Sequence, residues 1–99
     1  MRIVTPFARA VLDAVDRIPL GKVMSYSDVA VYVGAGSGRS VGTVMSRHGS
    51  EVPWHRVLHN DGTCATHKSE RQLDLLRDEG VPITGNRVDM KRARWSGRE

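Results

Sequence analysis

Residues 25–48 read SYSDVAVYVGAGSGRSVGTVMSRH, and this stretch decides the expected fold. Ser25 stands three residues before Asp28, which is the spacing of a capping box at the start of a helix. Three glycines then form a turn of about five residues, and a second short helix is predicted over residues 39–48. Two short helices joined by a glycine turn are typical of a helix-turn-helix.

The second of these helices has an exposed face made only of cationic and small residues. The residues on it are Arg39, Gly42, Thr43, Ser46 and Arg47. Small side chains let a helix backbone approach a duplex closely, and arginines contact phosphates or enter a groove. We therefore predict that Arg39, Ser40, Thr43 and Arg47 contact DNA, the alternative being an ordinary solvated face.

Helices are also predicted on both sides of this stretch. Apolar residues at helical spacing over residues 7–18 end at Pro19. Ser69 and Gln72 have the spacing of another capping box, which opens a helix that ends near Gly80.

The remaining segments favour short strands. Val57–Leu58 and Thr63–Ala65 flank the turn Asn60-Asp61-Gly62, which predicts a β-hairpin, and a further strand is expected over residues 87–90. The chain is therefore expected to be mainly α with a small β-hairpin, an α+β domain of the winged helix-turn-helix type.

Length and composition narrow the class of protein. A length of 99 residues predicts one domain, residues 1–99. The net charge is +4, and residues 87–98 hold five basic residues with Asp89 as the one acidic residue. Such a basic surface favours a polyanionic partner. One cysteine makes no internal disulfide, the histidines lack metal-ligand spacing, and no apolar run reaches the ~18 residues of a membrane span. We expect a monomer with no metal or cofactor, located in the cytoplasm, or at the nucleoid in a bacterium.

A five-residue segment, residues 53–57, carries a family resemblance. Pro-Trp-His-Arg-Val resembles the active-site motif Pro-Cys-His-Arg-Val of the 6-O-alkylguanine-DNA alkyltransferases, with tryptophan in place of cysteine. Other motifs agree in order: Ile18-Pro19-x-Gly21-x-Val23, Ser25-Tyr26, Arg39-x-Val41-Gly42-x-x-Met45, Asp61-Gly62-Thr63 and Glu79-Gly80. The resemblance covers residues 5–81 and, with Trp54 and the basic tail, is greatest to alkyltransferase-like proteins. It implies the fold of the C-terminal domain of DNA alkyltransferases.

The resemblance also implies roles for single residues. The second helix of the helix-turn-helix would enter the minor groove, where Arg39 would replace an extruded nucleotide in the base stack. Tyr26 would help to rotate that nucleotide, unless it is simply a core tyrosine, and the carbonyls of Trp54 and Val57 would receive the guanine amino group. The side chain of Trp54 would form a pocket wall, or else only pack. The implied lesion pocket consists of Tyr26, Pro53, Trp54, His55, Arg56, Val57 and His67.

Alkyl transfer in this family needs a thiolate beside a histidine. His55 and Glu79 occupy the matching positions, but Trp54 offers no nucleophile. The resemblance thus implies a non-enzymatic damage sensor. Such a protein would bind and flip 6-O-alkylguanine in double-stranded DNA and present it to nucleotide excision repair proteins. The alternatives are an active alkyltransferase that uses Cys64, and a helix-turn-helix transcriptional regulator.

Overall fold

The computed structural model describes residues 4–64 and 69–98. In chain order, its helices and strands are α1 (Pro6–Arg17), β1 (Met24–Ser25), α2 (Tyr26–Val33), α3 (Gly38–His48), β2 (Val57–Leu58), α4 (Ser69–Asp78), β3 (Ile83–Thr84), β4 (Arg87–Val88) and α5 (Met90–Ala93). Two single 3-10 turns, Gly49–Glu51 and Trp54–Arg56, connect α3 to β2. None of the described helices is long and apolar enough to span a membrane.

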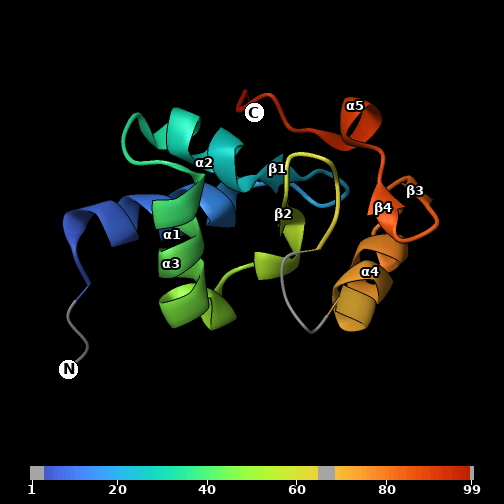
Figure 1. Cartoon of the computed structure of the whole chain (residues 1–99), viewed down its shortest axis with the longest axis horizontal. Coiled ribbons are helices and arrows are strands. Elements are labelled where there is room, and N and C mark those ends of the chain that lie inside the picture. The colour runs from blue at the N-terminus through green and yellow to red at the C-terminus, as the bar shows by residue number, and fades with distance from the viewer. Residues whose placement is uncertain (1–3, 65–68, 99) are drawn as a thin grey trace.

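The parallel strand pair β1–β2 divides the molecule into two halves. In Figure 1 this pair lies between α1–α3 on one side and α4, β3, β4 and α5 on the other. Met24 and Val57 belong to one buried cluster, whereas their chain neighbours Val23 and Leu58 belong to the other. Since successive side chains of a strand point to opposite faces, two short strands are enough to join both cores.

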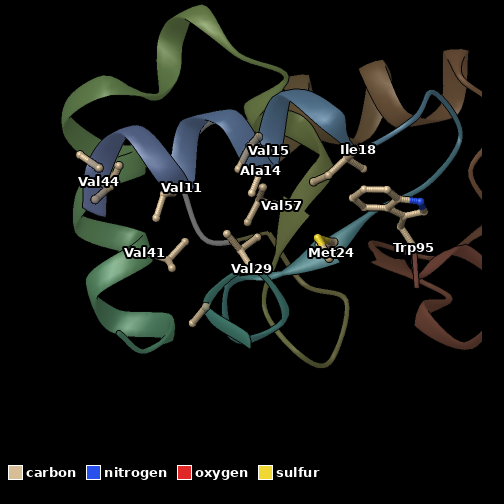
Figure 2. Close-up of a cluster of buried hydrophobic side chains, with 12 residues drawn as sticks. Val11, Ala14, Val15, Ile18, Met24, Val29, Val41, Val44, Val57 and Trp95 are labelled. Atoms are coloured by element: carbon tan, nitrogen blue, oxygen red, sulfur yellow. The ribbon is translucent and has the colours of Figure 1, made fainter. Parts of the chain in front are cut away.

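The larger core is formed mainly by α1, α2 and α3. Figure 2 shows its buried side chains, with Trp95 from the chain end beside Ile18 and Met24. The predicted apolar face of the first helix is confirmed, since Val11, Val15 and Ile18 are each at most 1% exposed. A backbone hydrogen bond from the Trp95 N–H to the carbonyl of Val23 ties this segment to the residue before β1.

The helix-turn-helix prediction is confirmed in its local detail. Ser25 and Asp28 form the predicted capping box, with the Ser25 hydroxyl accepting from the Asp28 N–H and the Asp28 carboxylate accepting from the Ser25 N–H. Helix α2 ends at Gly34, whose φ of 83° is the left-handed conformation that favours glycine. A second capping box, formed by Ser37 and Ser40, opens α3 one residue earlier than predicted.

The predicted β-hairpin at residues 57–65 is wrong. Strand β2 pairs with β1 in parallel, and Thr63 and Cys64 are not in a strand, while Ala65 lies outside the described residues. The turn itself forms, but the Asp61 carboxylate accepts from both the N–H and the hydroxyl of Thr63, which diverts that N–H from any strand ladder. At Gly62 a Cβ would lie 2.2 Å from the Val88 carbonyl oxygen, so the turn packs against β4 instead.

The hairpin of this fold lies nearer the chain end. Strands β3 and β4 pair antiparallel, with Ile83 opposite Val88. The strand predicted over residues 87–90 is therefore shorter than expected, because Met90 begins α5. The fold class of a mainly helical domain with short strands is confirmed.

Candidate nucleic-acid interface

A hollow of about 760 Å³ opens between the start of α2, the exposed side of α3 and residues 54–60. Its volume lies within the usual range of small-molecule sites. The described residues that line it are Tyr26, Ser27, Gly38, Arg39, Gly42, Met45, Ser46, Gly49, Ser50, Trp54, His59, Asn60 and Gln72. None of them carries a carboxylate, and Arg39 supplies a fixed positive charge, so the electrostatics favour an anionic or electron-rich guest.

The close approach of α2 and α3 brings Tyr26 and Arg39 to the same hollow. A Cβ at Gly38 would lie 3.0 Å from the Ser27 hydroxyl oxygen and 3.5 Å from the Cβ of Tyr26. Only a residue without a side chain fits that contact without displacing Ser27. Gly38 therefore allows α2 and α3 to approach each other closely beside Tyr26 and Arg39, the two predicted DNA-contacting residues.

Tyr26 lies on one wall of the hollow. Its ring is 5.7 Å from that of His59, at an interplanar angle of 55°. Burial raises the pKa of the Tyr26 hydroxyl, and the nearby Cys64 raises it further. The hydroxyl therefore keeps its proton at neutral pH and can donate a hydrogen bond to a guest.

The exposed face of α3 forms the opposite wall. Arg39 is exposed and makes no side-chain hydrogen bond or ion pair with any described residue, so its guanidinium is available to a partner. Ser40 and Thr43 are partly engaged within the helix, Ser40 in the capping box and Thr43 through its hydroxyl to the Arg39 carbonyl at 3.2 Å. Arg47 is exposed on the same helix, outside the hollow.

Trp54 is half-buried and lines the hollow where the chain enters β2. Its 3-10 turn is closed by hydrogen bonds from the Arg56 N–H to the Pro53 carbonyl and from the Val57 N–H to the Trp54 carbonyl. The neighbouring His55 ring meets the indole edge-on at 6.0 Å. The indole therefore offers an apolar surface to the hollow, while His55 lies on its other side.

His55 and Arg56 are directed to Glu79 rather than to the hollow. The Glu79 carboxylate lies 2.7 Å from the His55 Nε2 and accepts two hydrogen bonds from Arg56, at 2.9 and 3.0 Å. Arg56 also donates to the Ile18 carbonyl at 2.8 Å. Burial alone would raise the pKa of Glu79, but the hydrogen bonds from Arg56, His55 and the Gly21 N–H outweigh it and lower the pKa to about 2. The cluster joins α4 to the end of α1 and to the Trp54 turn.

The comparison with known families decides the classification. Residues 6–81 match the family described as "6-O-methylguanine DNA methyltransferase, DNA binding domain". The chain belongs to this family. The match covers α1 through α4 and ends just before β3.

Two curated relatives place the chain among the alkyltransferase-like members of the 6-O-methylguanine DNA methyltransferase family. Alkyltransferase-like protein 1 of Schizosaccharomyces pombe is 44% identical over 84 residues, with 78% of each chain covered. The DNA base-flipping protein of Escherichia coli is 38% identical over 96 residues, covering 91% of this chain and 74% of its own. The crystal structure of S. pombe Atl1 in complex with damaged DNA containing O6-carboxymethylguanine superposes with a TM-score of 0.83, at 35% identity, covering 97% of this chain and 99% of the other.

Among the described residues, the surroundings of Cys64 do not favour a nucleophilic thiol. It is half-buried beside the smaller core and does not line the hollow. Burial raises the pKa of its thiol, and its nearest hydrogen-bond acceptor is the Ser69 carbonyl at 3.9 Å. Reactive cysteines have lowered pKa values, so this environment works against thiolate formation.

The structure brings some predicted site residues to the hollow and leaves others elsewhere. Tyr26, Arg39 and Trp54 meet there, whereas Pro53, His55, Arg56 and Val57 do not line it. Val57 is fully buried, and its carbonyl accepts a hydrogen bond from the Gln72 side chain. His67 lies outside the described residues. The roles of all these residues toward a base stay predictions.

The sequence prediction missed several residues of the hollow, among them His59, Asn60 and Gln72. Gln72 was expected to close a capping box with Ser69, but its Nε2 donates to the carbonyls of His55 and Val57 instead. The burial of Gln72 could have been expected from the sequence, because helical spacing puts it on the same side of the helix as Leu73 and Leu76. All three residues are buried in the structure. Asn60 stood in the predicted turn and His59 directly before it, where nothing in the pattern marked them.

Proposed function

We propose that this protein binds 6-O-alkylguanine in double-stranded DNA, holds the base extruded from the helix, and transfers no alkyl group. The observation that carries the proposal is the hollow beside α3, where Tyr26, Arg39 and Trp54 meet without any carboxylate. Arg39 stands at the rim on α3, where its side chain can fill the gap that an extruded base leaves. The two curated relatives support the proposal, since they carry the names alkyltransferase-like protein and DNA base-flipping protein.

The absence of transfer follows from the chemistry at residue 54. The family resemblance places Trp54 where the alkyltransferases carry their cysteine, and an indole has no lone pair available for attack on an alkyl carbon. His55 remains, but it is held by Glu79 at 2.7 Å and has no thiol beside it to deprotonate. Cys64 lies outside the hollow with a raised pKa. The site keeps the means of recognition and lacks the nucleophile.

Binding without repair requires a second system to remove the lesion. By family resemblance, the complex presents the damaged site to nucleotide excision repair proteins. A held, extruded base and the distortion it causes in the duplex are features that such a system can recognise.

The test of this function uses a duplex that carries a labelled 6-O-methyl group. After incubation the label is expected to stay on the DNA, and the lesion is expected to be protected from an active alkyltransferase added afterwards. Cys64→Ser is the matched control variant, and it should protect the lesion as well as the wild type. Label recovered on Cys64 would make the protein an alkyltransferase. Failure to protect at concentrations that saturate undamaged DNA would leave only a basic helix-turn-helix domain.

A further inference from the structure

Gln72 is the one buried polar side chain among the described residues that line the hollow. It is 1% exposed, yet it lines the hollow at the point where α4 meets the Trp54 turn. Its side-chain Nε2 donates to the carbonyl oxygens of His55 and Val57, each at 3.0 Å. Exchanging the amide nitrogen and oxygen would set an acceptor against two acceptors, so these contacts settle which of the two atoms is the nitrogen.

The other end of this amide is unsatisfied. The Gln72 Oε1 is buried and has no hydrogen-bond partner among the described residues. A buried acceptor without a donor is costly, and native proteins carry few of them. The terminal torsion of a glutamine is soft, so the oxygen can turn toward a guest while Nε2 keeps one of its two carbonyls.

The chemistry of the proposed guest selects the donor that can reach this oxygen. Alkylation at O6 removes the proton from N1 of guanine, which leaves the ring nitrogens as acceptors. The exocyclic 2-amino group is then the only hydrogen-bond donor on the base. Any donor that a 6-O-alkylguanine brings to the floor of the hollow must therefore be that amino group.

We propose that Gln72 is a specificity-determining residue whose Oε1 accepts a hydrogen bond from the 2-amino group of the extruded purine. This inference rests on the proposed function and adds a side-chain acceptor to the backbone carbonyls of Trp54 and Val57. Gln72 would thereby recognise the edge of the base that carries the amino group. Because Nε2 also holds the Val57 carbonyl, the same side chain fixes the neighbouring acceptor.

The experiment compares two lesions in the same duplex, 6-O-methylguanine and 6-O-methylhypoxanthine, which lacks only the 2-amino group. The wild type is expected to bind the first about 3- to 10-fold more tightly, the range for one net hydrogen bond. Gln72→Lys keeps donors for the two carbonyls but has no acceptor, so this preference should fall at least threefold. The ratio of the two dissociation constants cancels the effect of the added charge. Gln72→Met, which removes donors and acceptor, serves if the lysine variant fails to fold.

The outcomes separate this inference from the proposed function. In one outcome the wild type prefers 6-O-methylguanine over guanine, but Gln72→Lys shows the same preference for 6-O-methylguanine over 6-O-methylhypoxanthine as the wild type. Gln72 would then only position the backbone carbonyls. That result would overturn the inference and leave the function intact. A wild type that does not distinguish 6-O-methylguanine from guanine would contradict the function itself. Thermal unfolding of each variant confirms that the protein compared is folded.

Discussion

Replacing Glu79 by glutamine is expected to destabilise the protein strongly at neutral pH. The carboxylate is 13% exposed and is bound by Arg56, His55 and the Gly21 N–H, which together lower its pKa from 4.5 to about 2. At 1.36 kcal/mol per pKa unit, that difference is worth about 3 kcal/mol of folding free energy. For a chain of this length the loss corresponds to a fall in Tm of more than about 10 °C.

The sign of the pH dependence follows from the lowered pKa. Between pH 4.5 and 2 the unfolded chain binds a proton at Glu79 that the folded chain does not. The stabilisation is therefore complete above about pH 4.5 and is lost as the pH falls to about 2. Denaturant unfolding of the wild type should show this loss, and Glu79→Gln should lack that part of the pH profile.

The matched control is Glu70→Gln, an exposed carboxylate in the first turn of α4, the helix that Glu79 directly follows. It should change the unfolding free energy at pH 7 by less than about 0.5 kcal/mol. The reasoning is refuted if Glu79→Gln at pH 7 is as stable as Glu70→Gln, or if the two variants lose stability in parallel between pH 5 and pH 2.

Four further substitutions test the DNA face. Arg39→Ala should weaken binding to a lesion duplex at least tenfold and to an undamaged duplex much less, and equal losses on the two duplexes would make Arg39 a phosphate contact. Arg47→Ala should weaken binding to both duplexes alike and flatten the dependence of log affinity on log salt concentration by about one. Tyr26→Phe should weaken lesion binding about 2- to 10-fold in a fluorescence titration, because its hydroxyl is a protonated donor in the hollow, and no change would leave only a packing role. Gly42→Leu should raise Tm, since a Cβ there meets nothing within 4 Å and leucine favours helix, yet it should weaken binding to both duplexes. Unchanged binding would show that α3 does not approach DNA closely.

Much of the helical framework could be predicted because its signals are local. The Ser25–Asp28 capping box, the glycine turn and the apolar face of α1 each depend on residues a few positions apart, and the structure confirms them. Strand pairing is different. The parallel pairing of Met24 with Val57 joins distant segments, and the Asp-Gly turn gave a competing local explanation for Val57–Leu58.

The candidate site shows the same division between local and distant information. Arg39 could be predicted because helix periodicity and the family resemblance both marked it, and Tyr26 because the resemblance alone marked it. Gln72 could not, because the Ser69-x-x-Gln72 spacing fits a capping box and the two carbonyls that it binds lie in a distant segment. The family resemblance had already paired His55 with Glu79, but the two hydrogen bonds from Arg56 to the same carboxylate became visible only in the fold.

The central claim is that the hollow beside α3 recognises an alkylated guanine within duplex DNA. The most direct measurement is the titration of two duplexes at one stated salt concentration, identical except that one carries 6-O-methylguanine in place of a single guanine. Since backbone contacts are the same in both, the ratio of their dissociation constants reports the base alone. The account predicts that the lesion duplex binds at least tenfold more tightly. Equal dissociation constants would contradict it.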